Sequence, residues 1–157
     1  FLVKDTSGAD RVATAELEYE GIFLVRGAEG GYADWTTGGG GPYDGLLLSS
    51  ANSFSEELGS ILTLLDAGKR QAAKEISARI SAAVEKLFPE AGKLPAGNAF
   101  ANANKVFDHY RAWGRTALET EPPLLYGGLR LPRELIDLGG KILEANNFEL
   151  GPGYMRG

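Results

Sequence analysis

The first helical pattern of the chain reads SFSEELGSILTLL, residues 53–65. Ser53 and Glu56 have the spacing of a capping box, in which the hydroxyl accepts from the amide three residues on and the carboxylate reaches back. Apolar residues then recur every three or four positions, which places them on one helix face. The stretch therefore predicts an amphipathic helix that begins at Ser53, with an apolar stripe of Phe54, Leu58, Ile61, Leu62 and Leu65.

Three further helices are predicted after this one. Residues 69–88 repeat the apolar spacing, and the proline that follows is expected to stop the helix. Asn98 is suited to cap a third helix, which runs to the Pro-Pro pair at 122–123. Pro132, at a first-turn position, opens a fourth helix that continues to about residue 147.

Each predicted helix has one apolar stripe and none is apolar all round. An up-down four-helix bundle over residues 53–157 buries all four stripes most simply, so the sequence predicts a mainly α fold. Phe107 and Trp113 are expected in its core. Gly139 and Gly140 lie inside the fourth helix, where we expect either a bend or another backbone packed closely against it.

Residues 1–52 have a different composition. They hold ten of the 22 glycines, including the block Gly38–Gly41, which predicts a mostly irregular N-terminal arm, flexible or draped over a surface, with a domain boundary at residue 52. The arm carries three Lys or Arg and eight Asp or Glu, so the whole net charge of −5 lies on it.

Short secondary structure is expected within this arm. Ala15–Glu20 alternates apolar and acidic residues, and Gly21–Arg26 continues as an apolar run, which predicts one or two strands. A short helix over Ala9–Tyr19 is an equal alternative, because alanine, glutamate and leucine are good helix formers.

Composition excludes several classes of function. The net charge of −5 and the pI near 5.0 argue against a nucleic-acid binder that works by neutralising phosphates. The chain has no cysteine and one histidine, which excludes disulfides, thiolate catalysis and zinc sites built on Cys or several His. No apolar run approaches the length of a bilayer span.

No catalytic, cofactor-binding or metal-binding residue is predicted. The Gly38–Gly45 segment lacks the Lys and Ser or Thr of a phosphate-binding loop. His109 has no partner motif for acid–base or nucleophilic chemistry and is expected to be an ordinary, partly exposed histidine. Glu56 and Glu57 are expected to favour the dipole of a helix N-terminus rather than to act as catalytic acids.

The aromatic residues of the arm are the first candidates for partner binding. Phe23, Tyr32, Trp35 and Tyr43 lie outside any helical stripe. Aromatic side chains in a glycine-rich segment are typical anchors for a partner surface, because they bury a large area with few rotors. The alternative is that Tyr32, Trp35 and Tyr43 fold back on the helices.

A second candidate surface is the basic face of the predicted helix at 69–88, where Lys69, Arg70 and Lys74 are named as partner-binding residues. Such a face is usually just solvated. It is also suited to receive the acidic arm or to dock on an acidic partner.

The layout resembles the PsbQ-like extrinsic proteins on the lumenal side of photosystem II. The resemblance covers the whole chain and lies in an extended arm of about fifty residues, the absence of cysteine and the basic, alanine-rich segment Lys69–Phe88. It implies a non-catalytic lumenal subunit that docks on a membrane complex, and no functional residue is carried over from it. The first residue, Phe1, in place of Met also favours an exported or organellar protein with residues upstream.

These observations predict an accessory subunit without a cofactor, which docks through its arm on protein subunits of a larger complex. The resemblance implies that this complex lies in the thylakoid lumen. A secreted hydrolase or toxin-like effector is the alternative from another class. A helical carrier of an apolar small molecule is the third.

Overall fold

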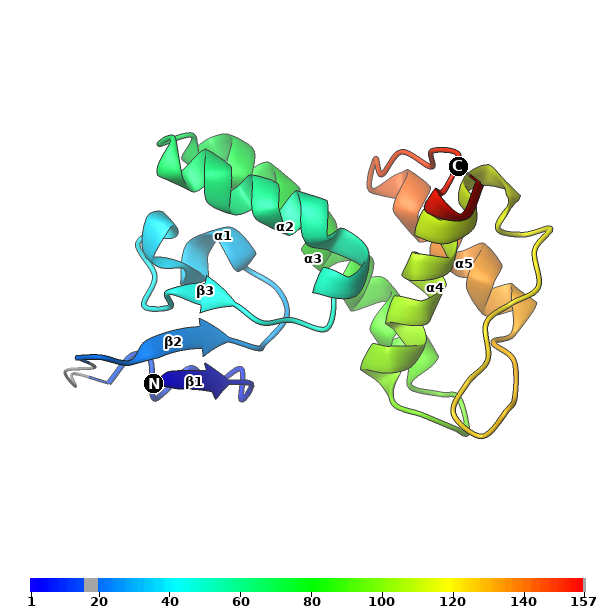
Figure 1. Ribbon diagram of the computed structural model, residues 1–157, viewed down its shortest axis with the longest axis horizontal. Helices are drawn as coiled ribbons and strands as arrows, with labels where there is room; N and C mark the ends of the chain where they lie inside the picture. The colour runs from blue at the N-terminus through cyan, green and yellow to red at the C-terminus, as the bar shows by residue number, and fades with distance from the viewer. Residues whose placement is uncertain (16–19, 157) are drawn as a thin grey trace. The chain divides into compact units, whose positions relative to one another are not determined.

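The computed structural model of the protein describes residues 1–15 and 20–156 (Figure 1). The chain forms two compact units, Phe1–Ser81 and Ala82–Gly157, and helix α3 (Arg70–Ala91) contributes to both. This division differs from the boundary expected at residue 52. The described residues are mainly helical, which confirms the predicted class, and they include one small sheet.

The sheet of the first unit has three parallel strands. β1 (Leu2–Asp5), β2 (Phe23–Arg26) and β3 (Gly45–Leu46) lie in the order β1-β2-β3. β2 confirms a strand within the predicted apolar run. The expectation for Ala15–Glu20 falls largely on residues outside those described. Of the alternative helix over Ala9–Tyr19, residues 9–15 are described, and they form turns and bends rather than a helix.

The two faces of this sheet have different surroundings. Successive side chains of a strand point to opposite faces. Leu24 packs with Ala13 and Tyr43, so Leu24 and Arg26 mark the inner face of the sheet, and Phe23 and Val25 mark the outer face. In the first unit, Trp35, the last residue of α1 (Tyr32–Trp35), packs against this inner-face cluster.

The glycine block forms a tight turn rather than a flexible segment. The short helix η1 (Thr37–Gly39) reverses the chain, and the Tyr43 amide donates to the Trp35 carbonyl at 3.1 Å. A side chain on Gly39 would overlap the carbonyl of Ala33, and one on Gly41 would overlap the backbone of Trp35. These glycines are needed because two backbone segments approach closely.

Helix α2 (Ala51–Asp66) begins before the predicted capping box. Its first turn starts at Ser50, whose carbonyl accepts from the amides of Ser53 and Phe54, and the cap makes no side-chain hydrogen bond. Phe54 interrupts the helix with φ −127° and ψ 29°. Ser53 is therefore inside the first turn and buried, so the predicted start at Ser53 is wrong.

The N-terminal residues belong to the same unit as α2 and the first part of α3. The Gly31 amide donates to Ser81 Oγ, and the Ala33 amide donates to Ser77 Oγ, both at 3.3 Å. α1 thus connects the sheet to α3, and the irregular arm of the sequence analysis is instead a packed part of the unit. α3 continues past Pro89 to Ala91, three residues beyond its predicted end.

The second unit confirms the cap predicted for the third helix. Asn98 Oδ1 accepts from the Ala101 amide at 2.8 Å and begins α4 (Ala99–Trp113). α5 (Arg133–Ala145) packs against α4. A four-helix bundle is not confirmed, because α2 lies in the first unit and α4 and α5 lie in the second.

The paired glycines of α5 create room for side chains of α4 rather than for another backbone. A Cβ atom on Gly139 would overlap Val106, and one on Gly140 would overlap the Tyr110 hydroxyl. That hydroxyl donates to the Ile136 carbonyl at 2.9 Å, and burial raises the pKa of Tyr110 to about 12. Two residues without side chains thus let α4 and α5 pack closely.

Two glycine-to-alanine substitutions should therefore have opposite signs. Gly140→Ala should lower the free energy of unfolding by about 1–3 kcal/mol, because the methyl group has to displace Tyr110. Gly59 lies on the exposed surface of α2 and has open space around its Cβ position. Gly59→Ala should therefore raise the free energy of unfolding by about 0.5–1 kcal/mol, because alanine has the higher helix propensity. Urea titrations of both variants check this, and a neutral Gly140→Ala would contradict the close packing.

Candidate functional site

A buried ion pair lies at the carboxyl ends of β1 and β2. Arg26, the last residue of β2, donates from Nε to Asp10 Oδ1 at 3.0 Å and from Nη2 to Asp10 Oδ2 at 3.1 Å. Asp10 is reached by the turn after β1 and has a φ of 53°, in the left-handed region. The hydrogen bond from Arg26 is the main reason that the pKa of Asp10 is lowered.

Arg26 also fixes the loop that follows its own strand. Its Nη1 donates to the carbonyls of Ala28 at 2.9 Å and Gly30 at 2.7 Å. The guanidinium carbon lies 4.6 Å from the centre of the Trp35 ring, within range of a cation–π interaction. A guanidinium engaged on this many sides orders the loop and is not available to a ligand.

Tyr43 closes the same cluster from the segment before β3. Its hydroxyl lies 2.6 Å from Asp10 Oδ1 and 3.1 Å from Asp5 Oδ2. Burial, together with the neighbouring carboxylates, raises the pKa of Tyr43, so the hydroxyl keeps the proton that it donates. Hydrogen bonds from Ser7 lower the pKa of Asp5. The cluster therefore holds two carboxylates, one guanidinium and one phenol.

A second carboxylate network lies beside it. Glu29 accepts from the Tyr32 hydroxyl at 2.9 Å, from Ser49 Oγ at 2.8 Å, and from the Ser50 amide and hydroxyl at 3.1 and 2.6 Å. These bonds join the loop after β2 to the start of α2. The donors of the chain itself occupy the Glu29 oxygens, so this network supports the fold rather than a reaction.

The lowered pKa values predict loss of stability in acid. Asp5 and Asp10 have folded-state pKa values below the unfolded value of about 3.9, so their stabilisation is present above pH ~4 and is lost as the pH falls through the folded values. Asp10→Asn should be less stable than the parent at pH 7 and should depend less on pH below 4. Urea titrations between pH 2 and 7 test this, and parallel curves for both proteins would contradict it.

The outer face of the sheet is an exposed apolar surface of the first unit. By strand alternation and register it carries Leu2, Lys4, Phe23 and Val25, and Leu47, directly after β3, continues the alternation. Val25 is buried at its centre, whereas Leu2, Phe23 and Leu47 are 61%, 52% and 49% exposed. Sequence reasoning found Phe23 but missed Leu2 and Leu47, because each becomes a neighbour of Phe23 or Val25 only through parallel pairing.

The predicted aromatic anchors differ in their exposure. Phe23 is exposed, whereas Tyr32 and Tyr43 are each 0% exposed, so their rings are not available as anchors. Trp35 is partly buried, at a centroid distance of 6.2 Å from Tyr43. The Tyr43 ring packs with Ala13 and Leu24 on the inner face of the sheet, and the buried Tyr32 donates its hydroxyl to Glu29. The alternative expectation of folding back is thus the correct one for Tyr32 and Tyr43.

The predicted basic face lies at the start of α3. Lys69, Arg70 and Lys74 are exposed, and Lys74 Nζ forms an ion pair of 2.7 Å with Asp34 of α1. For Lys74, this matches the alternative in which the basic face receives the acidic N-terminal segment. A partner role for Lys69 and Arg70 stays a prediction.

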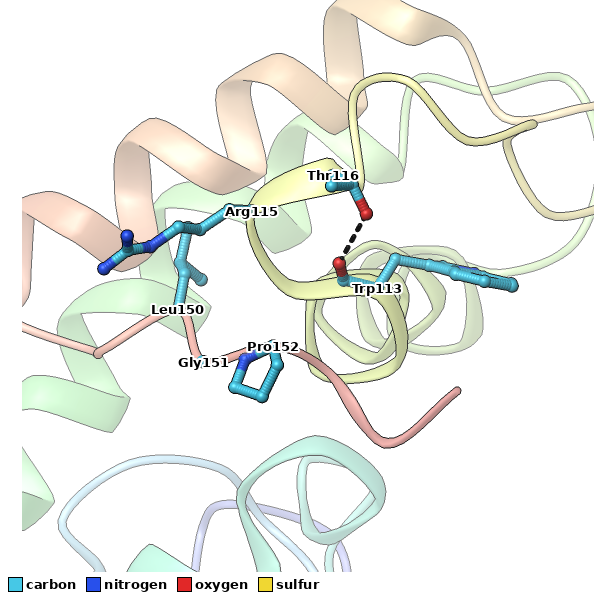
Figure 2. A pocket seen from close by; sticks show the side chains of 6 residues that line it. All are labelled: Trp113, Arg115, Thr116, Leu150, Gly151 and Pro152. Carbon is cyan, nitrogen blue, oxygen red and sulfur yellow. Dashed lines mark hydrogen bonds between the residues drawn. The ribbon is translucent and has the colours of Figure 1, made fainter. Parts of the chain in front are cut away.

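The second unit has open grooves that are candidate ligand sites. One has a volume of about 320 Å³ and is lined by Trp113, Arg115, Thr116, Leu150, Gly151 and Pro152. Figure 2 shows that the Trp113 ring and the Arg115 guanidinium point to opposite sides of the groove. The Thr116 hydroxyl donates a hydrogen bond to the Trp113 carbonyl at 2.9 Å. The polar groups of this groove therefore do not converge on one point.

His109 is buried rather than partly exposed, which corrects the expectation. Its Nε2 lies 2.8 Å from the Ala117 carbonyl, so this nitrogen is the protonated one and donates a structural hydrogen bond. Within the described residues, no His, Cys, Asp and Glu side chains group in a way that could hold a metal ion. None of the helices in that part of the chain has the length and apolar character that a membrane span requires.

Comparison with known proteins gives no relative. No protein-family model matches the chain, and neither a curated protein nor a solved structure matches it. The outer face of the sheet, built from Leu2, Phe23 and Leu47, is thus the candidate functional surface on physical grounds alone.

Proposed function

We propose that the chain is a docking subunit, which binds an apolar protein surface of a larger assembly through the outer face of its N-terminal sheet. The observation that carries this proposal is the difference between the two faces of an all-parallel sheet. Ala13, Trp35 and Tyr43 pack on the inner face, whereas the outer face exposes Leu2, Phe23 and Leu47. All-parallel sheets are almost always covered on both faces.

The chemistry of the outer face favours a protein as the partner. Three large apolar side chains surround the buried Val25, and Lys4 is the one charged residue among them. Exposed apolar patches of this kind typically mark interaction sites, and aromatic residues are over-represented among the side chains that contribute most of the binding energy. Phe23 is the aromatic residue of this patch.

The location and the partner implied by the resemblance are narrower proposals. A photosystem subunit in the thylakoid lumen is one assembly of the required kind, and the docking proposal does not depend on it. The acidic character of the first 52 residues further favours a partner with basic groups around its apolar surface.

The proposal is tested with the tagged full chain in cells of its natural host. The chain should elute in a complex much heavier than its own 16.7 kDa, and Phe23→Ser should shift it to the monomer position, because the substitution removes the central apolar contact. Size-exclusion chromatography with mass determination measures both.

The matched control is Tyr126→Ser, which removes an aromatic side chain that is 84% exposed in the second unit. This variant should remain in the complex. Circular dichroism of each purified variant establishes that the fold is kept. A monomeric parent chain, or a Phe23→Ser variant that remains in the complex, would overturn the proposal.

A further inference from the structure

Strand β1 has a free edge. It pairs with β2 and with no other described strand, and it lies at the margin of the sheet (Figure 1). The carbonyls of Phe1 and Asp5 accept from the amides of Phe23 and Gly27, at 2.6 and 2.7 Å. Because backbone groups of successive residues point to opposite sides of a strand, residues 1, 3 and 5 face β2.

The backbone groups of the alternate residues therefore point away from β2. The N–H and C=O groups of Leu2 and Lys4 are directed to the free edge, where no residue in the described part of the chain bonds to them. An unpaired row of this kind is a template for another strand.

β1 is short and carries Lys4, two features that protect sheet edges, but it contains no proline, and no element in the described part of the chain covers its free edge. A Cβ atom on Gly27 would overlap Cε of Lys4, so the lysine side chain lies over the end of β2 and leaves the free edge uncovered. The Asp5 carboxylate is on the inner face, where it accepts from the Ser7 amide and contacts the Tyr43 hydroxyl.

We propose that β1 accepts an additional strand from the partner polypeptide, which extends the sheet and places an apolar side chain beside Leu2. This inference rests on the proposed docking function and specifies its geometry. Strand addition provides main-chain hydrogen bonds, while side chains on the outer face provide specificity. The partner would then contact the free edge of β1 and the outer face of the sheet in one continuous interface.

The partner strand comes from a different polypeptide rather than from a second copy of this chain. Pairing β1 with its own copy would bring together two N-terminal segments that each carry a net charge of −5. Like charges at close range oppose such an interface. A partner with neutral or basic groups has no such penalty.

Amide exchange in the complex isolated from the natural host gives a residue-by-residue test. In the isolated chain, the Val3 and Asp5 amides should exchange slowly, and those of Leu2 and Lys4 should exchange fast, because only the former pair bonds to β2. In the complex, exchange at Leu2 and Lys4 should slow by about tenfold or more. Unchanged exchange there in an intact complex would overturn strand addition.

Two substitutions at one position provide an independent test. Lys4→Pro removes only an N–H that points to the free edge, so the isolated chain should keep its sheet while its affinity in the complex falls about tenfold or more. Lys4→Ala removes the side chain alone and should bind like the parent. Equal binding by Lys4→Pro, with its fold verified by amide exchange at Val3 and Asp5, would contradict the proposal.

The outcomes separate this inference from the docking function. Loss of the complex in Phe23→Ser but not in Lys4→Pro would leave docking through the outer face in place and overturn strand addition. A parent chain that forms no complex would overturn both.

Discussion

Replacing Arg26 by methionine should lower the free energy of unfolding by about 3–5 kcal/mol, which is the usual cost of breaking a buried ion pair from one side. The side chains of Arg26 and Asp10 are only 6% and 4% exposed, so the substitution leaves a buried carboxylate without its cation. It also removes the donors to the carbonyls of Ala28 and Gly30. Urea titration at pH 7 measures the change.

The double variant Arg26→Met with Asp10→Leu is the control. Replacing both partners of a buried pair by apolar groups is often nearly neutral, so the second substitution should restore part of the loss. Tyr43 still has Asp5 as an acceptor in this variant. A single variant with a loss below about 1 kcal/mol would show that the pair is accessible to water.

Replacing Phe107 by alanine should cost about 3–5 kcal/mol, because its ring is 0% exposed in the second unit and the substitution leaves a cavity. Trp113→Ala should cost less, although the sequence predicts both rings in the core. Trp113 is only partly buried, at the rim of the open groove of Figure 2. Thermal unfolding followed by circular dichroism compares the two variants.

If both variants lose the same free energy of unfolding, Trp113 belongs to the core and does not line an open groove. A small loss in Phe107→Ala would contradict the burial of this ring in the core of the second unit. The comparison is informative because both residues lie on α4 and differ mainly in burial.

The helical part of the fold was predictable because its signals are local. Asn98 accepts from an amide three residues away, and the apolar stripe of α4 repeats every three or four residues. Even there, the start of α2 was misplaced, because the packing of Phe54 overrides the local capping pattern.

The candidate site was only partly predictable. Phe23 was identified as an aromatic residue in a glycine-rich segment, and it is exposed. Tyr32 and Tyr43 have the same local signal but are buried, because Tyr43 packs with Leu24 of β2 and Tyr32 donates to the buried network of Glu29. A sequence without an alignment does not separate an exposed ring from a buried one in such a segment.

The sequence by itself thus determined a mainly α chain without thiol chemistry and with its net charge confined to residues 1–52. Only the tertiary structure decided the parallel pairing of β1 with β2, the buried contact of Arg26 with Asp10, and the apolar outer face around Val25. The physical reason is the separation along the chain. Helix periodicity and capping act over three or four residues, whereas Leu2 and Phe23 become neighbours only when a long connection brings two strands together.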